Sequence, residues 1–257
     1  MLRRVAGEPA LLLGGPRALL LQLAHPKIAA AVAQHSDFRE RPWLRLWRTL
    51  DPLVLLVFGT EPQRRRALAT VARTHDRVRG RLPGAAGRWR AGAAYSAHDR
   101  AAQAWVLLTL ADTSELVFER FVRGFHPGER EALWSDWRGL GLVFGIPPRL
   151  LPERWEGYRA RLRETLESDL LSVGAETRAL AAAVLRPKLP LLPPALWEPA
   201  VSLTAALLPP RLREAYGLRL GARERFASAV WTRSQRLTWR LVPRARRALP
   251  RLYCRVR

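Results

Sequence analysis

The sequence predicts an all-α protein built as a single globular domain of many helices. Its 257 residues are enough to bury a substantial core. Leu, Ala and Arg dominate the composition, and all three are good helix formers. There are no alternating apolar runs joined by hairpin dipeptides, and no repeat of fixed period. We therefore expect one domain over residues 1–257, with a basic C-terminal tail at 241–257.

The chain is strongly basic, with a formal net charge of +22. Lys27 and Lys188 are its only lysines, so nearly all of the positive charge is carried by arginine. Such a skew, together with abundant Ala and Pro, is more typical of GC-rich coding than of selection for a polyanionic partner. The positive field still attracts anionic membranes and nucleic acid non-specifically. No recognisable nucleic-acid module is present, so we expect no specific nucleic-acid partner.

The N-terminal region begins like a targeting segment, but its apolar part is too short for a signal peptide or a membrane-spanning helix. Met1 to Arg4 begins like a signal peptide, but Gly7 to Pro9 interrupts it. The apolar run over residues 9–24 is broken by Gly14 to Arg17, which leaves it shorter than the roughly 20 residues of a spanning helix. Cys254 is the single cysteine, which excludes an intrachain disulfide. We expect a cytoplasmic protein that contacts membranes only peripherally.

Prolines mark the first helices. Pro16 fits the start of a helix through Ala24, and Pro26 the start of another through Gln34. His25 lies between them, and its spacing from the next histidine is not the i, i+4 spacing of a helical zinc pair. A helix-capping role is favoured for His25 over a role in a site.

A helix that starts at Pro42 carries a concentrated set of hydrogen-bond donors. Arg45, Arg48 and Thr49 are spaced three and four residues apart and share one helical face, beside two tryptophans. Charges at this spacing usually form a solvated basic face. The alternative is an anion grip, for instance on a carboxylate or propionate, next to an aromatic wall.

The next helix runs from Thr60 to Gly80. Thr60 and Gln63 have the spacing of a capping box, and Gly80 is a typical stop. Apolar residues recur at helical spacing on one face, and His75 occupies one of these positions. A neutral imidazole that faces a core can bond a backbone carbonyl or bind a metal, and the residues alone leave both interpretations open.

The following segments can be assigned more briefly. Residues 81–97 indicate a surface loop, and Asp99 is the expected cap of a central buried helix that continues to about Arg123. Asp112 and Glu115 lie on that helix. Solvent-facing carboxylates are favoured for both, and the alternative is a carboxylate that orients a metal-bound imidazole.

The second half of the chain predicts more helices. One begins at Pro127, a charged outer helix begins at Pro152, and short helices follow over residues 189–210. Residues 222–257 form a basic amphipathic segment with tryptophans. Such a segment suits an anionic lipid surface, and it equally suits a helix that caps the core with its outer face solvated.

Several motifs resemble one family in their order along the chain. They are residues 14–26, Gln34-His35-Ser36, Arg45, Arg48-Thr49, Phe58-Gly59-Thr60, His75, Trp105-Val106 and residues 207–218. Over about residues 8–240 the sequence resembles the catalytic domain shared by MpaB-type oxygenases and rubber oxygenases (latex clearing proteins).

The resemblance implies a haem b pocket between helices. It implies that His75 is the proximal iron ligand and that Arg45 supports the haem. Arg48 matches the position near the oxygen side of the iron, and Thr49 would support the haem or the pocket. Arg48 replaces the family's lysine, and an arginine cannot lose its proton to ligate iron. Residues 28–33 hold no carboxylate where the family has an acidic residue.

The functional hypothesis is therefore a haem-dependent oxygenase. The resemblance implies that it uses molecular oxygen to cleave an unsaturated apolar substrate, isoprenoid in type, at a carbon–carbon double bond. The alternative is a non-catalytic basic helical protein that binds anionic membranes or nucleic acid.

Overall fold

The computed structural model describes residues 1–35, 51–187, 197–241 and 253–254. Helices dominate these residues, which confirms the all-α prediction. The helical elements of the first half include α1 (Leu2–Ala6), η1 (Pro9–Gly14), α2 (Gly15–Leu23), α3 (Pro26–His35), α5 (Glu61–Asp76) and α6 (Arg100–Val117), and residues 51–58 are helical as well. Those of the second half are η3 (Phe118–Val122), α7 (Glu129–Val143), η4 (Pro148–Leu150), α8 (Trp155–Glu167), α9 (Ala175–Leu185), α10 (Glu198–Leu207), α11 (Pro210–Ala215) and α12 (Ala222–Leu241).

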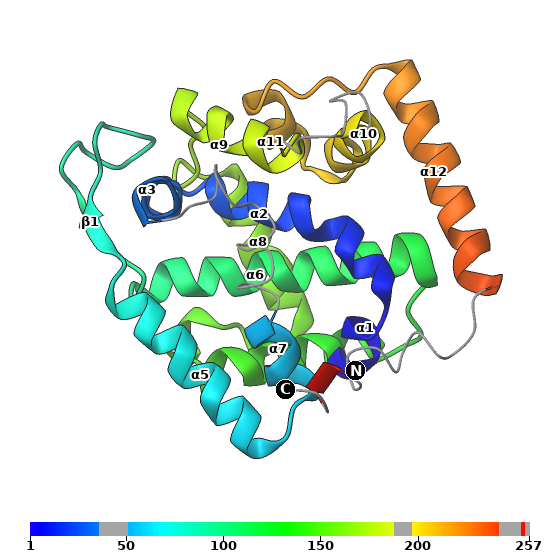
Figure 1. Cartoon of the computed structure of the whole chain (residues 1–257), viewed down its shortest axis with the longest axis horizontal. Coiled ribbons are helices and arrows are strands. Elements are labelled where there is room, and N and C mark those ends of the chain that lie inside the picture. Colours follow the sequence, from blue (N-terminus) through cyan, green and yellow to red (C-terminus); the bar gives the residue numbers. More distant parts are fainter. Residues whose placement is uncertain (36–50, 188–196, 242–252, 255–257) are drawn as a thin grey trace.

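Helix α6 is the centre of the molecule. Its cap is the predicted one, because the Asp99 side chain accepts hydrogen bonds from the backbone N–H groups of Ala101 and Ala102, at 3.0 and 3.3 Å. It is apolar around most of its circumference, and Trp105 is fully buried. Figure 1 shows α6 crossing the molecule between α2 and α7.

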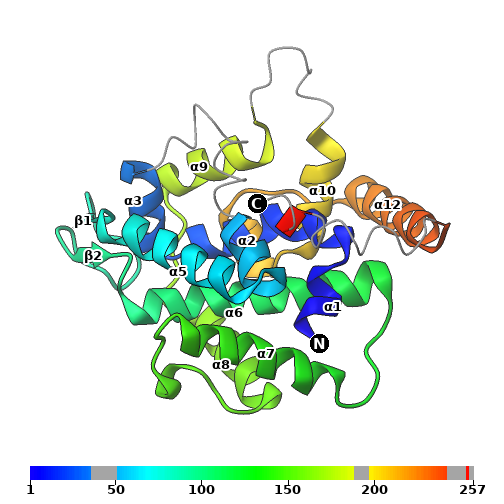
Figure 2. The same ribbon diagram turned by 60° about the horizontal axis from the view of Figure 1, so that its bottom comes forward.

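Two groups of helices cover α6. In Figure 2, α3 and α9 lie on one side of α6, and α7 and α8 lie on the other. On the α7–α8 side the Trp134 and Tyr158 rings stack with centroids 4.3 Å apart. Such a pair contributes roughly 0.5–1.5 kcal/mol beyond the area that it buries. On the other side η1 approaches α6 closely, since a Cβ at Gly14 would collide with the Thr113 and Val117 side chains.

A small hairpin replaces part of the predicted surface loop. Strand β1 (Arg79–Arg81) pairs antiparallel with β2 (Ala94–Ser96), and Gly80 lies opposite Tyr95. Three-residue strands are too short to give an alternating pattern, so the expectation of a plain loop over residues 81–97 was wrong. The hairpin packs over α3 through a cluster that includes Ala30, Leu82 and Tyr95.

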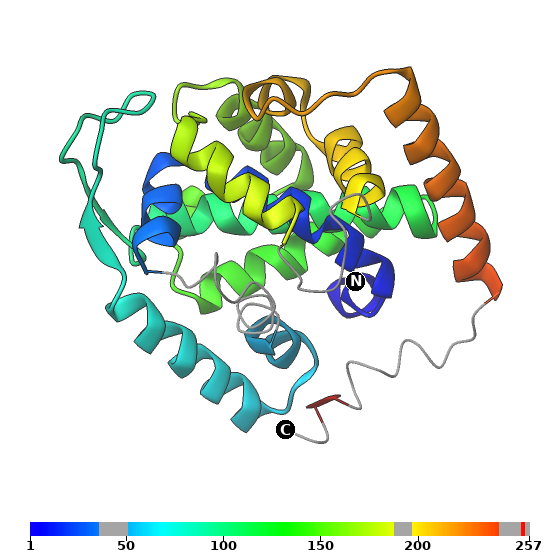
Figure 3. The same cartoon turned by 45° about the horizontal axis from the view of Figure 1, so that its top comes forward.

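Helix α5 begins as predicted and ends earlier. The Thr60 N–H donates to the Gln63 side chain at 2.8 Å, which satisfies one free backbone donor of the first turn. The helix stops at Asp76 rather than Gly80, because the chain enters β1 at Arg79. Figures 1 and 3 place α5 and α12 on opposite flanks of the molecule.

Two residues within the predicted tail pack against the region around the start of α5. Gln63 Nε2 donates to the Cys254 backbone oxygen at 2.6 Å, and the Tyr253 hydroxyl donates to Asp51. Cys254 is buried with Leu55 in a small apolar cluster. This contact joins segments nearly 200 positions apart in sequence. None of the helices in the described ranges is long and apolar enough to cross a membrane.

Candidate functional site

His75 lies in the last turn of α5, on the face that looks toward the body of the molecule. Its side chain is half-buried. Burial lowers the pKa of the imidazole, and the neighbouring His98 lowers it further, against an opposing effect of Asp76. The ring makes no hydrogen bond within the described part of the chain. A neutral imidazole without a partner is the form of histidine that binds metal.

His98 fixes the orientation of the His75 ring from the side. The two rings meet edge to face, with centroids 6.0 Å apart and planes 85° apart. His98 is itself held by Asp76, whose Oδ1 lies 2.8 Å from His98 Nε2. Because Asp99 caps α6, this contact ties the end of α5 to the start of the central helix.

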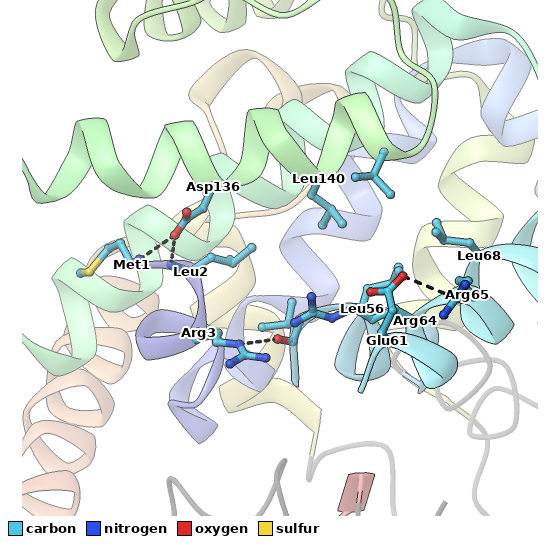
Figure 4. A pocket seen from close by; sticks show the side chains of 12 residues that line it. Met1, Leu2, Arg3, Leu56, Glu61, Arg64, Arg65, Leu68, Asp136 and Leu140 are labelled. Atoms are coloured by element: carbon cyan, nitrogen blue, oxygen red, sulfur yellow. Dashed lines mark hydrogen bonds and ion pairs between the residues drawn. The ribbon is translucent and has the colours of Figure 1, made fainter. Parts of the chain in front are cut away.

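A cavity of about 550 Å³ opens between α5, α7 and α1 (Figure 4). Its apolar walls include Leu56, Leu68 and Leu140. The charged groups around it are largely paired with each other or with backbone atoms. They are Met1 N with Asp136, Arg3 with the Val57 oxygen, and Arg65 with Glu61. The cavity is within the size range of small-molecule and cofactor sites.

Arg64 is the exception among the charged residues of this cavity. Its Nε is buried and has no hydrogen-bond partner among the described residues. Arg64, Leu68 and His75 follow each other at spacings of four and seven residues, so they share one face of α5. From Arg64 to His75 is about 16 Å along the helix axis at 1.5 Å per residue. His75 itself lies outside the residues that line the cavity.

The other predicted site residues lie outside the described part of the chain. Arg45, Arg48 and Thr49 fall within residues 36–50, and their roles remain predictions. Within the described ranges, no group of three His, Cys, Asp or Glu side chains is placed to hold a metal ion.

The expectation that Asp112 and Glu115 face solvent was wrong. Their exposed fractions are 5 % and 7 %. Asp112 accepts from Arg17 Nη2 and from Arg159 Nη1, each at 2.5 Å. A carboxylate inside a helical core is stabilised by such pairing, and sequence spacing did not reveal the two arginines because they lie on other helices.

Glu115 has a similar environment. Its two oxygens accept from Arg130 Nε and from Trp155 Nε1, each at 3.1 Å. Burial nevertheless raises the pKa of this carboxyl. Neither carboxylate contacts a histidine in the described part of the chain, so the prediction of an imidazole-orienting role finds no support there.

His25 is buried between α2 and α3 against Trp89, with ring centroids 5.8 Å apart. Its Nδ1 has no hydrogen-bond partner among the described residues. The pKa of His25 is lowered from 6.5 to about 4, mainly by burial and with a contribution from Lys27, against the opposing effect of Asp99. The folded protein therefore holds this histidine neutral throughout the physiological range.

The lowered pKa of His25 predicts that the free energy of unfolding depends on pH. The unfolded chain protonates His25 below about pH 6.5, whereas the folded chain does so only near pH 4. The stabilisation is thus complete above pH 6.5 and is lost as the pH falls toward 4, by about 3 kcal/mol. Urea unfolding across this range should give a shallower pH dependence for His25→Gln than for wild type. The exposed His126→Gln variant should retain the wild-type slope, and equal slopes for all three proteins would refute the prediction.

Comparison with known proteins adds one match. Residues 2–247 match the family model described as the ER-bound oxygenase mpaB/B'/rubber oxygenase catalytic domain. Comparisons with curated proteins and with solved structures give no match. The match spans nearly the whole chain, including α5 with His75 and the central helix α6. The chain therefore belongs to the MpaB/rubber oxygenase catalytic-domain family.

Proposed function

We propose that the chain is a haem-dependent oxygenase in which His75 would ligate the iron. One observation carries this proposal: a half-buried imidazole, with its pKa lowered by burial, shares a face of α5 with Leu68 and Arg64, which line a cavity of mixed apolar and charged walls, and the Arg64 Nε has no partner among the described residues. A b-type haem has an apolar ring, two anionic propionates and an iron that takes a protein nitrogen as ligand. His75 would supply that nitrogen, Arg64 would supply a cation for a propionate, and Leu68, which lies between them on α5, would supply apolar contact.

The residues of the chain have distinct tasks in this proposal. His75 holds the iron, and the His98–Asp76 pair limits rotation of the His75 ring. Arg64, together with Arg45 in its predicted role, would supply cations for the propionates. Arg48 and Thr49 are proposed as hydrogen-bond donors on the oxygen side. The leucines of the cavity wall would provide apolar contacts for the substrate.

Haem supplies the chemistry of dioxygen binding and transfer. The proposed substrate is an unsaturated apolar chain of isoprenoid type. Cleavage of one carbon–carbon double bond by one O₂ gives two carbonyl groups, so that no further reductant is needed. The protein contributes ligation, orientation and a site of low polarity.

Oxygen uptake tests this function. Protein loaded with haem is given squalene, and the saturated analogue squalane serves as control. We expect O₂ consumption and carbonyl products, detected as hydrazones, with squalene only. Haem-loaded protein that consumes no more O₂ with squalene than free haem does would argue against an alkene-cleaving oxygenase.

A second feature supports peripheral contact with membranes. Helix α12 exposes Phe226 and Val230, with exposed fractions of 72 % and 51 %, between the exposed Arg225 and Arg233. Val230 therefore points outward, whereas Ser228 on the same helix is buried. Exposed apolar side chains flanked by arginines suit the surface of an anionic bilayer.

Vesicle co-sedimentation checks this membrane contact. Phe226→Asp/Val230→Asp should bind phosphatidylserine-containing vesicles at least about tenfold more weakly, because each apolar side chain contributes roughly 1.5–3 kcal/mol when buried. Leu142→Asp, a half-exposed position on α7, is the matched control and should bind like wild type. Equal binding by all three would contradict the proposal. Strong vesicle binding by protein that neither takes up haem nor consumes O₂ would favour the non-catalytic alternative.

A further inference from the structure

A second pocket lies on the side of α6 that faces α2, α8 and the junction of α10 with α11. Its volume is about 270 Å³. It shares no lining residue with the cavity beside α5. The polar lining residues are Arg17, Asp112, Arg159 and Arg163.

Positive charge is in excess in this pocket, where three guanidinium groups meet one carboxylate. Arg17 is buried and held from three directions, by Asp112, by Thr113 Oγ1 at 2.6 Å and by the Leu207 oxygen at 2.8 Å. Both oxygens of Asp112 are occupied, since Arg159 binds the second one. Arg17 and Arg159 together therefore more than neutralise Asp112. The pocket carries a net positive charge.

Arg163 carries a further positive charge that takes no part in the pairing of Asp112 with Arg17 and Arg159. It lies one helical turn beyond Arg159 on α8, its side chain is exposed, and it makes no ion pair or hydrogen bond within the described ranges. Arg159 itself is partly exposed and donates one of its five N–H groups to Asp112. The two side chains line the same pocket, and the guanidinium of Arg163 has no hydrogen-bond partner among the described residues.

The rest of the lining is apolar. It consists of Leu116, Leu162, Leu166, Leu207, Leu208 and Pro209. Water gains little from contact with such a wall, whereas a hydrocarbon chain is stabilised there by roughly 0.8 kcal/mol for each buried CH₂ group. A ligand that satisfies both parts of the pocket needs an anionic head and a short apolar chain.

We propose that this pocket binds a carboxylic acid with a short aliphatic chain. The carboxylate lies between Arg159 and Arg163, because a planar carboxylate matches the paired N–H groups of a guanidinium. The chain lies along the leucines of α8 and of the α10–α11 junction. The volume lies just below the usual 300–1,000 Å³ of ligand sites, which restricts the ligand to a small acid. The proposal is independent of haem and of His75.

Isothermal titration calorimetry of the whole 257-residue chain with octanoate tests the site. We expect saturable binding of one octanoate per chain, weakened at least about tenfold in Arg163→Gln, since hydrogen bonds between charged groups are the strong ones. Arg161→Gln is the matched control. Arg161 lies on the same helix, is exposed, pairs with Glu164 and does not line the pocket, so this variant should bind like wild type.

The neutral analogue 1-octanol has the same chain but no negative charge, so it distinguishes the contribution of the arginines from that of the apolar wall. It should bind much more weakly than octanoate. Absence of saturable octanoate binding to the wild type would overturn the proposal. Equal loss of binding in Arg163→Gln and Arg161→Gln, or equal affinity for octanoate and octanol, would also overturn it. Both variants change exposed side chains, so far-ultraviolet circular dichroism should show that they are folded.

Discussion

Asp112→Ala is expected to lower the free energy of unfolding by about 3–5 kcal/mol. The substitution removes the charged acceptor of the buried Arg17 and leaves that guanidinium with Thr113 and the Leu207 carbonyl as its partners among the described residues. An uncompensated charge inside a helical core is costly because it has lost its hydration. Unfolding by urea, followed by circular dichroism at 222 nm (the usual helix signal), measures this change.

Two variants separate the charge effect from simple loss of volume. Replacing both partners, Arg17→Met with Asp112→Leu, should recover most of the lost stability, because no buried charge remains. Glu164→Ala removes an exposed pair with Arg161 and should change stability by less than about 1 kcal/mol. A loss in Asp112→Ala no larger than in Glu164→Ala would show that the buried pairing does not stabilise the fold.

His75→Ala is expected to weaken haem binding by about 100-fold or more, since even outer partners of a metal ligand are worth 10–100-fold in affinity. The side chain is half-buried at the end of α5, so its removal should leave the fold intact. Titration with haemin, followed by the intense near-ultraviolet absorption band of the bound cofactor, gives the affinity.

His35→Ala is the matched control for this variant. His35 lies in the same region of the molecule, where its Nε2 is 3.1 Å from the Arg79 backbone oxygen and its ring meets Tyr95. It should bind haem like the wild type. If His35→Ala and His75→Ala lost haem equally, the effect would reflect damage to the hairpin region rather than loss of an iron ligand.

Local signals in the sequence predicted the helices well. Asp99 is the cap of α6, and Thr60 with Gln63 starts α5, because these side chains act on backbone groups two or three residues away. The buried character of α6 followed from apolar residues on nearly all of its sides. The last turns were less predictable, and α5 ends where the hairpin pairing begins.

Contacts between distant segments were beyond the reach of the sequence alone. Asp112 finds its partners 95 and 47 residues away, and a charged residue inside an apolar helix gives no sign of which helix will carry the opposite charge. Which face of α12 is covered could not be read from the sequence for the same reason, since the neighbouring α10 and η3 decide which side is covered.

The site assignment itself stays a prediction. The placement of His75 on a helix face beside apolar residues followed from spacing, although Leu68 and Val71 are half-buried rather than core residues. Its contact with His98 depends on how the start of α6 meets the end of α5, which no local pattern encodes. Arg45, Arg48 and Thr49 lie outside the described residues and stay predictions.

Rescue of His75→Gly by free imidazole tests the central claim most directly. If the His75 ring coordinates the iron, the glycine variant should lose the wild-type haem absorption band, and added imidazole should restore it by filling the vacated position. A His75→Gly protein that binds haem as tightly as the wild type, with the same spectrum and without added imidazole, would contradict the assignment of His75 as the iron ligand.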